Sequence, residues 1–233
     1  MSRRGTEVDV LVSGAGMVGL TVALAAARAG FSVALVDARE PTPWAAGQEV
    51  DLRVSALSRA TQRVLERLGV WEYIAGRRAG PVEAIAAWDG LSEASVAFSA
   101  ADMGERHLAH IVENSLVQTA LWEALGAEEA ARRYVPAAVE ALDPGSGRVG
   151  VRLGDGRRLT AGLVVGADGA ASTVRDLAGI DISTHDYGQL GVVATVATEL
   201  AHGRVARQRF LPGGPVAFLP LADGRCSIVW SQP

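Results

Sequence analysis

The residues with the clearest capacity for chemistry lie near the N-terminus, in the run Gly14-Ala15-Gly16-Met17-Val18-Gly19. Glycines at this spacing form the GxGxxG pattern, which between a strand and a helix binds the pyrophosphate of a dinucleotide. The first glycine permits a tight turn, the second lets the backbone approach the phosphates, and the third lets the helix pack on the strand. Asp37 follows at the distance expected of an acid that accepts a hydrogen bond from a ribose 2′-hydroxyl. An acid at this position favours FAD or NAD over NADP.

The elements that must position this motif are a strand, a helix and a second strand. Val8–Val12 is a short apolar run typical of a strand buried on both faces. Leu20–Ala29 is rich in Ala and Leu and predicts a helix, which Gly30 ends as a C-terminal cap would. Phe31–Val36 is a second apolar strand that ends at Asp37. The pattern predicts a β-α-β unit with parallel strands and a right-handed crossover.

A second motif follows the apolar run Leu163–Val165, which predicts a third buried parallel strand. It reads Gly166-Ala167-Asp168-Gly169-Ala170-Ala171-Ser172-Thr173-Val174-Arg175 and opens a short helix over Ser172–Ala178. Ser172 is suited to cap that helix. On spacing alone, this motif is either a capped strand-to-helix turn or part of a ligand site.

The rest of the chain mixes helices with short strands. The expected elements before residue 183 are helices at Ser58–Leu68 and Asn114–Leu125, a hairpin within Pro81–Phe98, a strand at Leu108–Val112 and a β-meander of Ala137–Leu142, Val149–Leu153 and Arg158–Thr160. Beyond it, an antiparallel sheet is expected from Val192–Thr198, Val205–Leu211, Val216–Leu219 and Arg225–Trp230.

These elements predict an α/β fold, α+β overall. A Rossmann-like nucleotide-binding domain with a parallel sheet and a β-meander insertion is expected over residues 1–182. A β insertion near residues 76–106 is expected to join the sheet of a second domain. Residues 183–233 would begin that second domain, an antiparallel sheet that is incomplete in this chain.

Composition removes several enzyme classes. The 22 basic residues are all Arg, and without Lys the chain can form neither a Lys Schiff base nor a P-loop. The single Cys, Cys226, excludes an internal disulfide, a CxxC redox pair and a thiolate zinc site. Cys226 lies in an apolar strand and is expected to be an inert core thiol. With 49% hydrophobic and 21% charged residues, the chain has a globular composition.

Charge and hydropathy limit the partners. A net charge of −4 argues against nucleic acid as a partner, and the pairs Arg77-Arg78, Arg132-Arg133 and Arg157-Arg158 are expected to be solvated loop residues. The basic start Met1-Ser2-Arg3-Arg4 does not lead into a signal peptide. No apolar run reaches the roughly 18 residues of a membrane span. We expect a cytoplasmic protein, with peripheral attachment at the inner membrane and homo-oligomer formation left open.

The two glycine motifs together resemble those of the flavin-dependent aromatic hydroxylases, the para-hydroxybenzoate hydroxylase-like superfamily. These enzymes combine an N-terminal GxGxxG with a later DGxxSxVR, here Asp168–Arg175. Further stretches are similar to those of the ubiquinone-biosynthesis hydroxylases in particular: Arg53–Ser58 running into Leu68–Trp71, His110–Ser115 followed by Ala120–Trp122, and Ala217–Leu221 with Cys226–Ser231. The resemblance covers essentially the whole chain.

The resemblance implies an FAD site on the matching residues. The pyrophosphate would be held by the first motif, Gly14, Ala15, Gly16, Met17, Val18 and Gly19. Asp37 would bind the adenosine ribose, Arg53 the flavin nucleotide and Asn114 the ribityl chain. A backbone group of Val139 would meet adenine. Asp168 and Gly169 would serve FAD and are also linked to NAD(P)H.

The resemblance also implies the reaction. NAD(P)H would reduce the flavin, O2 would add to give a C4a-hydroperoxide, and this would hydroxylate the ring of a polyprenylated phenol. The protein would bind and orient the reactants and would keep water out of the site. The resemblance implies no metal and assigns no catalytic side chain. His107 and His110 lie on a predicted strand at a spacing that points them to opposite faces, so they are expected to be structural or near-site polar residues. Trp88, Trp122 and Trp230 are expected in the core or at a domain interface.

One departure from the family pattern affects the whole interpretation. The family carries a third motif, a Gly-Asp pair that would contact the ribityl ribose, and its place lies beyond position 233. The chain is therefore expected to be a truncated sequence or a broken gene model. Alternatives to a polyprenylphenol hydroxylase remain: a flavin hydroxylase of another aromatic compound, a prenyl reductase of the same superfamily, or an inactive FAD-binding fragment. Association with a ubiquinone-biosynthesis complex also stays open.

Overall fold

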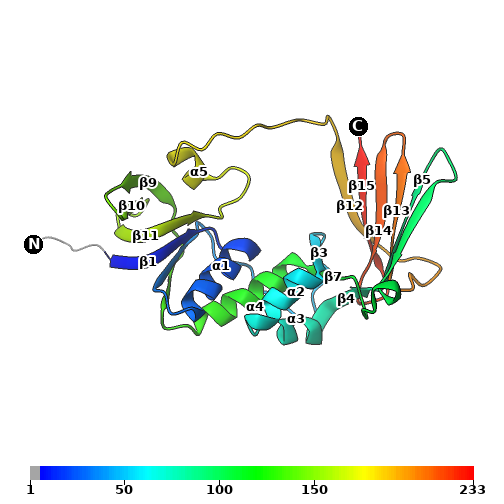
Figure 1. The fold of residues 1–233 in the computed structure, drawn as a ribbon, viewed down its shortest axis with the longest axis horizontal. Helices are drawn as coiled ribbons and strands as arrows, with labels where there is room; N and C mark the ends of the chain where they lie inside the picture. The colour runs from blue at the N-terminus through cyan, green and yellow to red at the C-terminus, as the bar shows by residue number, and fades with distance from the viewer. Residues whose placement is uncertain (1–5) are drawn as a thin grey trace, which may run out of the picture. The chain divides into compact units, whose positions relative to one another are not determined.

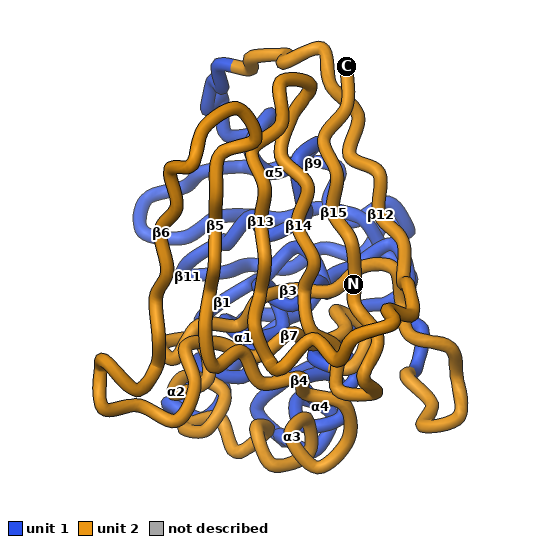
Figure 2. The backbone as a smooth tube through the Cα atoms, turned by 90° about the vertical axis from the view of Figure 1, so that its right-hand side faces the viewer, with its two compact units in different colours: residues 1–43, 117–183 blue, residues 44–116, 184–233 orange. Residues whose placement is uncertain are grey.

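The computed structural model describes residues 6–233 and divides into two compact units, shown in different colours in Figure 2. Unit 1 contains residues 1–43 and 117–183, and unit 2 contains residues 44–116 and 184–233. The basic start Met1-Ser2-Arg3-Arg4 lies outside the described residues. The division differs from the expected boundary at 182, because residues 44–116 group with the C-terminal sheet and not with the nucleotide-binding half.

The sheet of unit 1 has six strands in the order β8-β2-β1-β11-β10-β9. Their bounds are β1 Thr6–Ser13, β2 Val33–Val36, β8 Ala131–Tyr134, β9 Val139–Pro144, β10 Val149–Leu153 and β11 Arg158–Gly166. The pairs β1–β2, β1–β11 and β2–β8 are parallel, whereas β10 pairs antiparallel with β9 and β11. The predicted β-α-β unit and β-meander are both present, which confirms the Rossmann-like fold class.

Two strand predictions need correction. Arg158–Thr160 and Leu163–Val165, expected as separate strands, are parts of the single strand β11. Gly162 interrupts the apolar pattern between them, but the backbone continues and pairs with β1 along its length. Leu163 is also 55% exposed, so this half of β11 is not buried on both faces. The second strand begins at Val33 instead of Phe31, whose side chain is exposed.

Three helices accompany this sheet. They are α1 Met17–Arg28, α4 Asn114–Gly126 and α5 Thr173–Leu177, and the boundary between the units falls within α4. Helix α1 packs on β1 and β2, and α5 packs on β9 and β11. The core of the meander side contains Leu11, Val36, Leu153 and Val174, all buried. Each such side chain stabilises the fold by about 1.5–3 kcal/mol relative to its exposed state.

The larger sheet of unit 2 has the order β12-β15-β14-β13-β5-β6. Its strands are β5 Ala84–Asp89, β6 Ser95–Ser99, β12 Leu190–Val196, β13 Val205–Leu211, β14 Gly214–Pro220 and β15 Cys226–Gln232. All neighbours are antiparallel except β13 and β5, which run parallel with Val205 opposite Ala84. The hairpin β5–β6 extends the C-terminal strands into one sheet, and Figure 1 shows these strands side by side.

A smaller sheet and two helices complete unit 2. Strands β3 Val54–Ser58, β7 Ala109–Glu113 and β4 Ala79–Val82 pair antiparallel in the order β3-β7-β4. Helix α2 Arg59–Arg67 is capped by Ser58, whose hydroxyl accepts from the N–H of Thr61. The remaining elements are α3 Trp71–Arg78 and the single 3₁₀ turn η1 Ala101–Met103. No helix within residues 6–233 is long and apolar enough to cross a membrane.

The arginine pairs do not all lie in loops. Arg77 and Arg78 end helix α3, and Arg78 is ion-paired with the buried Glu113. Arg132 and Arg133 lie in strand β8, where the Arg133 guanidinium stacks over the Trp122 ring at 4.2 Å. The partners of these arginines, a buried carboxylate and an indole, come from other elements of the chain, so a local charge pattern does not reveal them.

Candidate functional site

The first glycine motif is the turn between β1 and α1 in unit 1. Gly14 has φ +113°, and its N–H donates to the carbonyl of Val36 at 2.8 Å. A Cβ at Gly14 would lie 2.2 Å from the carbonyl oxygen of Ala167, and one at Gly19 would lie 1.9 Å from that of Gly14. Both positions are therefore filled by backbone. Only glycine permits this turn and the close contact of α1 with it.

Gly16 differs from the two other glycines of the motif. Apart from its chain neighbours, no heavy atom of the described residues lies within 4 Å of a Cβ built there. Gly16 is also the N-cap of α1, and no side chain in the described part of the chain caps this helix end. The first turn of α1 carries no acid. Open space beside uncapped N–H groups, at the positive end of a helix dipole, fits a phosphate group.

Asp37 lies at the end of β2, directly beside the glycine turn. Its Oδ2 accepts from the N–H of Ala15 at 2.6 Å, and its Oδ1 accepts from the N–H of Arg39 at 2.9 Å. The carboxylate thus fixes the turn and still has lone pairs for a ribose hydroxyl. The Asp37 carbonyl accepts from Ala137 at 2.8 Å, which brings the segment leading to Val139 next to the same strand end. Val139 itself is buried and opens β9.

The second motif follows β11 in the same unit. The N–H of Ala167 donates to the carbonyl of Ser13 at 2.7 Å, so this loop lies against the glycine turn. The Asp168 carboxylate accepts from the Ser172 hydroxyl and from the N–H of Val174. Ser172 caps α5, as expected, by accepting from the N–H of Arg175 at 3.0 Å. The side chain of Asp168 thus stabilises the start of α5, while Gly169, with φ +94°, turns the chain into it.

Gln118 contacts the glycine turn, a role that was not expected from the sequence. Its Nε2 donates to the carbonyl of Ala15 at 2.6 Å, so a side chain of α4 holds the glycine turn from a second direction. Gln118 follows Asn114 by four residues, which places both on one face of the helix. This spacing was the available signal.

Arg53 and Asn114 form a separate group, in unit 2. The N–H of Asn114 donates to the carbonyl of Arg53 at 3.0 Å where β3 and β7 meet. The hydroxyl of Ser55 donates to Asn114 Oδ1 at 2.7 Å, which fixes the amide and leaves Nδ2 as its donor end. The Arg53 side chain is exposed. The structure therefore brings together two residues that are 61 positions apart and that were assigned to one cofactor.

The expectation that His107 and His110 face opposite sides is wrong. Their ring centroids are 4.1 Å apart, and the His110 ring meets Trp71 edge-on at 5.0 Å. His107 precedes β7 and so escapes the alternation of the strand. Arg59 lies 3.0 Å from Nε2 of His107 and ion-pairs with Glu105. Burial, then His107 and Arg59, lower the pKa of His110 to about 4. Burial and Arg59 also lower the pKa of His107.

This histidine cluster predicts a loss of stability in acid. A folded-state pKa below the usual 6.5 means that the unfolded chain binds the proton more tightly, so stability falls as pH drops from 6.5 through 4. After discounting for the half-exposed ring, we expect a loss of roughly 1–2 kcal/mol from His110. Urea unfolding at pH 7, 5.5 and 4 measures it. His110→Phe keeps a ring against Trp71 and should show the smaller pH dependence; an unchanged dependence would contradict the role of His110.

Cys226 and three of the tryptophans differ in their burial. Cys226 is buried, as expected, and burial raises the pKa of its thiol. Trp88 and Trp122 are partly buried, whereas Trp230 is 37% exposed on β15. Trp230 is therefore not a core residue of unit 2.

Comparisons with known proteins show to which family the chain belongs. A family model described as an FAD binding domain matches residues 7–221. The chain is 38% identical over 230 residues to 3-demethoxyubiquinol 3-hydroxylase from Escherichia coli, covering 99% of this chain and 58% of that protein. It is 40% identical over 225 residues to ubiquinone hydroxylase UbiL from Rhodospirillum rubrum, covering 96% of this chain and 52% of that one. The chain thus spans little more than half the length of these relatives.

Comparison with solved structures agrees with the family match. The structure of PqsL, a probable FAD-dependent monooxygenase from Pseudomonas aeruginosa, superposes with a TM-score of 0.83 at 25% identity, over 98% of this chain and 61% of that one. A glycine turn suited to a phosphate, an acid beside it, and a family model that spans both units all point the same way. The chain belongs to the FAD-binding domain family of flavoproteins.

Proposed function

We propose that this chain binds FAD and serves an NAD(P)H- and O2-dependent hydroxylation of the ring of a polyprenylated phenol in ubiquinone biosynthesis. The observation that carries the proposal is the β1–α1 turn, where Gly14 and Gly19 are closed by backbone while Gly16 borders open space at an uncapped helix end. The names of two relatives, a 3-demethoxyubiquinol 3-hydroxylase at 38% identity and a ubiquinone hydroxylase at 40%, support the reaction class.

The proposed cofactor contacts are those that the family resemblance assigns. Gly14, Ala15, Gly16, Met17, Val18 and Gly19 would hold the pyrophosphate, with Asp37 on the adenosine ribose. The backbone at Val139 would meet adenine, and Asp168 with Gly169 would shape the loop that serves FAD and NAD(P)H. Arg53 would bind the flavin nucleotide, and Asn114 would donate through Nδ2 to the ribityl chain. When bound, FAD supplies the electron transfer and oxygen activation that no side chain of this protein can supply.

Two related compounds are candidates for the substrate. The sequence resembles 2-octaprenylphenol hydroxylase, whereas one relative is named for 3-demethoxyubiquinol. Both substrates carry a ring and a long apolar tail. A tail of this kind supports a peripheral place at the inner membrane, because contact with the membrane would let the substrate pass from lipid to protein without crossing water. Membership of a complex of ubiquinone-biosynthesis enzymes, or a homo-oligomer, is part of the same proposal.

The reaction is tested by supplying FAD, O2 and either NADH or NADPH, with a prenylated phenol or with phenols that lack the prenyl chain. We expect NAD(P)H oxidation and a product heavier by one oxygen only with the prenylated ring. Stimulation only by the short phenols would contradict the ubiquinone assignment and favour a hydroxylase of another aromatic compound. FAD binding without NAD(P)H oxidation would favour an inactive FAD-binding fragment.

Asp37 gives a direct test of the nucleotide half. Asp37→Ala removes the predicted ribose acceptor and the bond to the N–H of Ala15, so we expect FAD affinity to fall about 10–100-fold. Fluorescence titration with FAD measures the affinity. Asp9→Ala is the matched control, because the Asp9 carboxylate also accepts a backbone N–H, from Ser32 at 2.8 Å. Equal affinity of Asp37→Ala and the wild type would contradict the assignment of this acid.

A further inference from the structure

Glu113 is a buried acid between the two cofactor residues proposed in unit 2. It ends β7 and is 2% exposed, and the next residue, Asn114, begins α4. In the β3–β7 register Glu113 lies opposite Val54, the neighbour of Arg53. Glu113 therefore lies where the segment of Arg53 meets the segment of Asn114.

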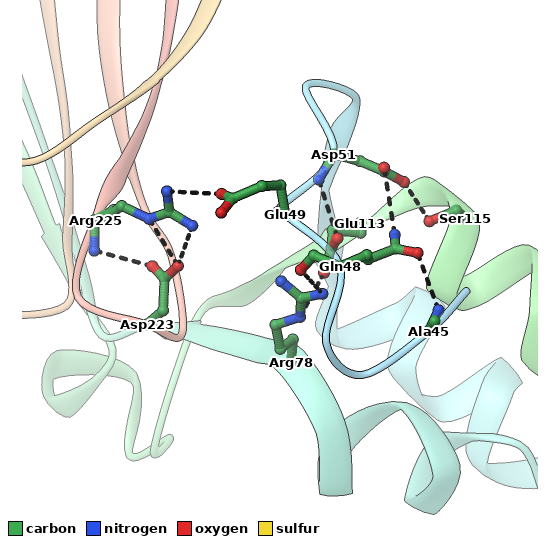
Figure 3. Close-up of polar contacts among 9 residues, drawn as sticks. All are labelled: Ala45, Gln48, Glu49, Asp51, Arg78, Glu113, Ser115, Asp223 and Arg225. Atoms are coloured by element: carbon green, nitrogen blue, oxygen red, sulfur yellow. Dashed lines mark hydrogen bonds and ion pairs between the residues drawn. The ribbon is translucent and has the colours of Figure 1, made fainter.

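The carboxylate and its partner hold the loop that leads to Arg53 (Figure 3). Glu113 Oε1 accepts from the N–H of Asp51 at 3.0 Å. Arg78 Nε lies 3.2 Å from Glu113 Oε2, an ion pair outside hydrogen-bond geometry. Arg78 Nη2 in turn donates to the carbonyl of Gln48 at 2.9 Å. Each member of the pair therefore binds the backbone of the loop, at two points before Arg53.

Other contacts secure the same loop. The Asp51 carboxylate accepts from the hydroxyl of Ser115, which is the second residue of α4. Arg225 contacts Glu49 at 3.3 Å, but Glu49 is 90% exposed there and such pairs contribute little. In the Arg78–Glu113 pair, by contrast, the two side chains are 19% and 3% exposed. These contacts are drawn together in Figure 3.

A buried ion pair is a poor source of stability, because the desolvation of both charges offsets their attraction. It does fix geometry, since its partners must stay in place to remain paired. We propose that Glu113 is a positioning residue for the flavin: through Asp51 and Arg78 it sets the spacing between Arg53 and Asn114. The proposal rests on the proposed function, because it takes these two residues as FAD contacts.

Glu113→Gln tests the proposal with little change in shape. The neutral amide weakens the bond from Asp51 and the attraction to Arg78, so we expect the Kd for FAD to rise about tenfold. We also expect the amides of residues 48–53 to exchange hydrogen about tenfold faster in the FAD-free protein. Glu83→Gln is the control, because Glu83 pairs with Arg204 in the same unit but at the surface. Its Kd should stay within about twofold of the wild type.

A double-mutant cycle separates positioning from a general loss of structure. If Glu113 acts through Arg53, its substitution should raise the Kd about threefold or less in an Arg53→Ala background. The same tenfold loss in both backgrounds, or an unchanged Kd in Glu113→Gln, would overturn the proposal. If Glu113→Gln does not fold, Arg78→Lys loosens the same loop while it keeps the charge, and the same outcomes apply. A wild-type chain that does not bind FAD would contradict the proposed function instead.

Discussion

Gly16→Ala is expected to lower FAD affinity by about 100-fold or more while the chain keeps its fold. A Cβ at this position meets no heavy atom of the described residues within 4 Å, so the substitution causes no internal clash. The only structural cost is a poorer N-cap for α1, at most about 1 kcal/mol. The space that the methyl group would fill is the space that a phosphate needs beside the first N–H groups of α1.

The test of Gly16→Ala combines two measurements. FAD titration gives the affinity, and thermal unfolding without FAD should shift by no more than about 2–4 °C. Gly76→Ala serves as control, because Gly76 is a second glycine with nothing within 4 Å of a built Cβ, and it lies in α3 of the other unit. Wild-type affinity in Gly16→Ala would show that the phosphate binds elsewhere.

Gly19→Ala is expected to destabilise unit 1 by about 3 kcal/mol or more. Helix propensity alone predicts the opposite, since alanine is favoured over glycine inside a helix by about 1 kcal/mol. At position 19 a steric clash, and not helix propensity, decides whether the substitution raises or lowers stability. The new Cβ would lie 1.9 Å from the carbonyl oxygen of Gly14 and 3.2 Å from the Cβ of Ala167. The nearer atom is backbone of the buried turn, so α1 must move away from β1.

Urea unfolding without FAD measures this effect separately from binding. Gly76→Ala again provides the contrast, because its exposed helical site should gain up to about 1 kcal/mol from the same substitution. Opposite signs in the two variants would establish that contact with the turn, and not propensity, governs position 19. Similar stabilities of Gly19→Ala and the wild type would mean that α1 does not pack this closely.

The parts of the structure that local sequence could predict are those in which neighbouring residues act together. The strand, glycine turn, helix and acid of residues 8–37 form one continuous pattern. The cap at Ser172 was predictable because Ser172 directly precedes the helix that it caps. The β-meander was also predictable from its turn residues, although Gly162 made one strand look like two. In each case the interacting residues lie within about 30 positions of one another.

The remaining features depend on distant segments. The pair of Arg78 and Glu113 joins helix α3 to the end of β7, and the parallel pairing of β5 with β13 spans more than 100 residues. Neither leaves a periodic trace in the sequence. The contact of His107 with His110 was missed because His107 precedes the strand that was assumed to orient it. The four-residue spacing from Asn114 to Gln118 places both on one helix face, but it does not reveal that Gln118 reaches the carbonyl of Ala15, 103 positions away.

The central claim is that the turn from Gly14 to Gly19 makes this chain a flavin-binding protein. Calorimetric titration of the purified chain with FAD, beside Gly16→Ala, tests it most directly. The structure predicts saturable binding of one FAD per chain with a Kd of about 1 μM or tighter, and a loss of about 100-fold or more in Gly16→Ala. A folded wild-type chain without saturable FAD binding, or equal binding by the two proteins, would contradict it.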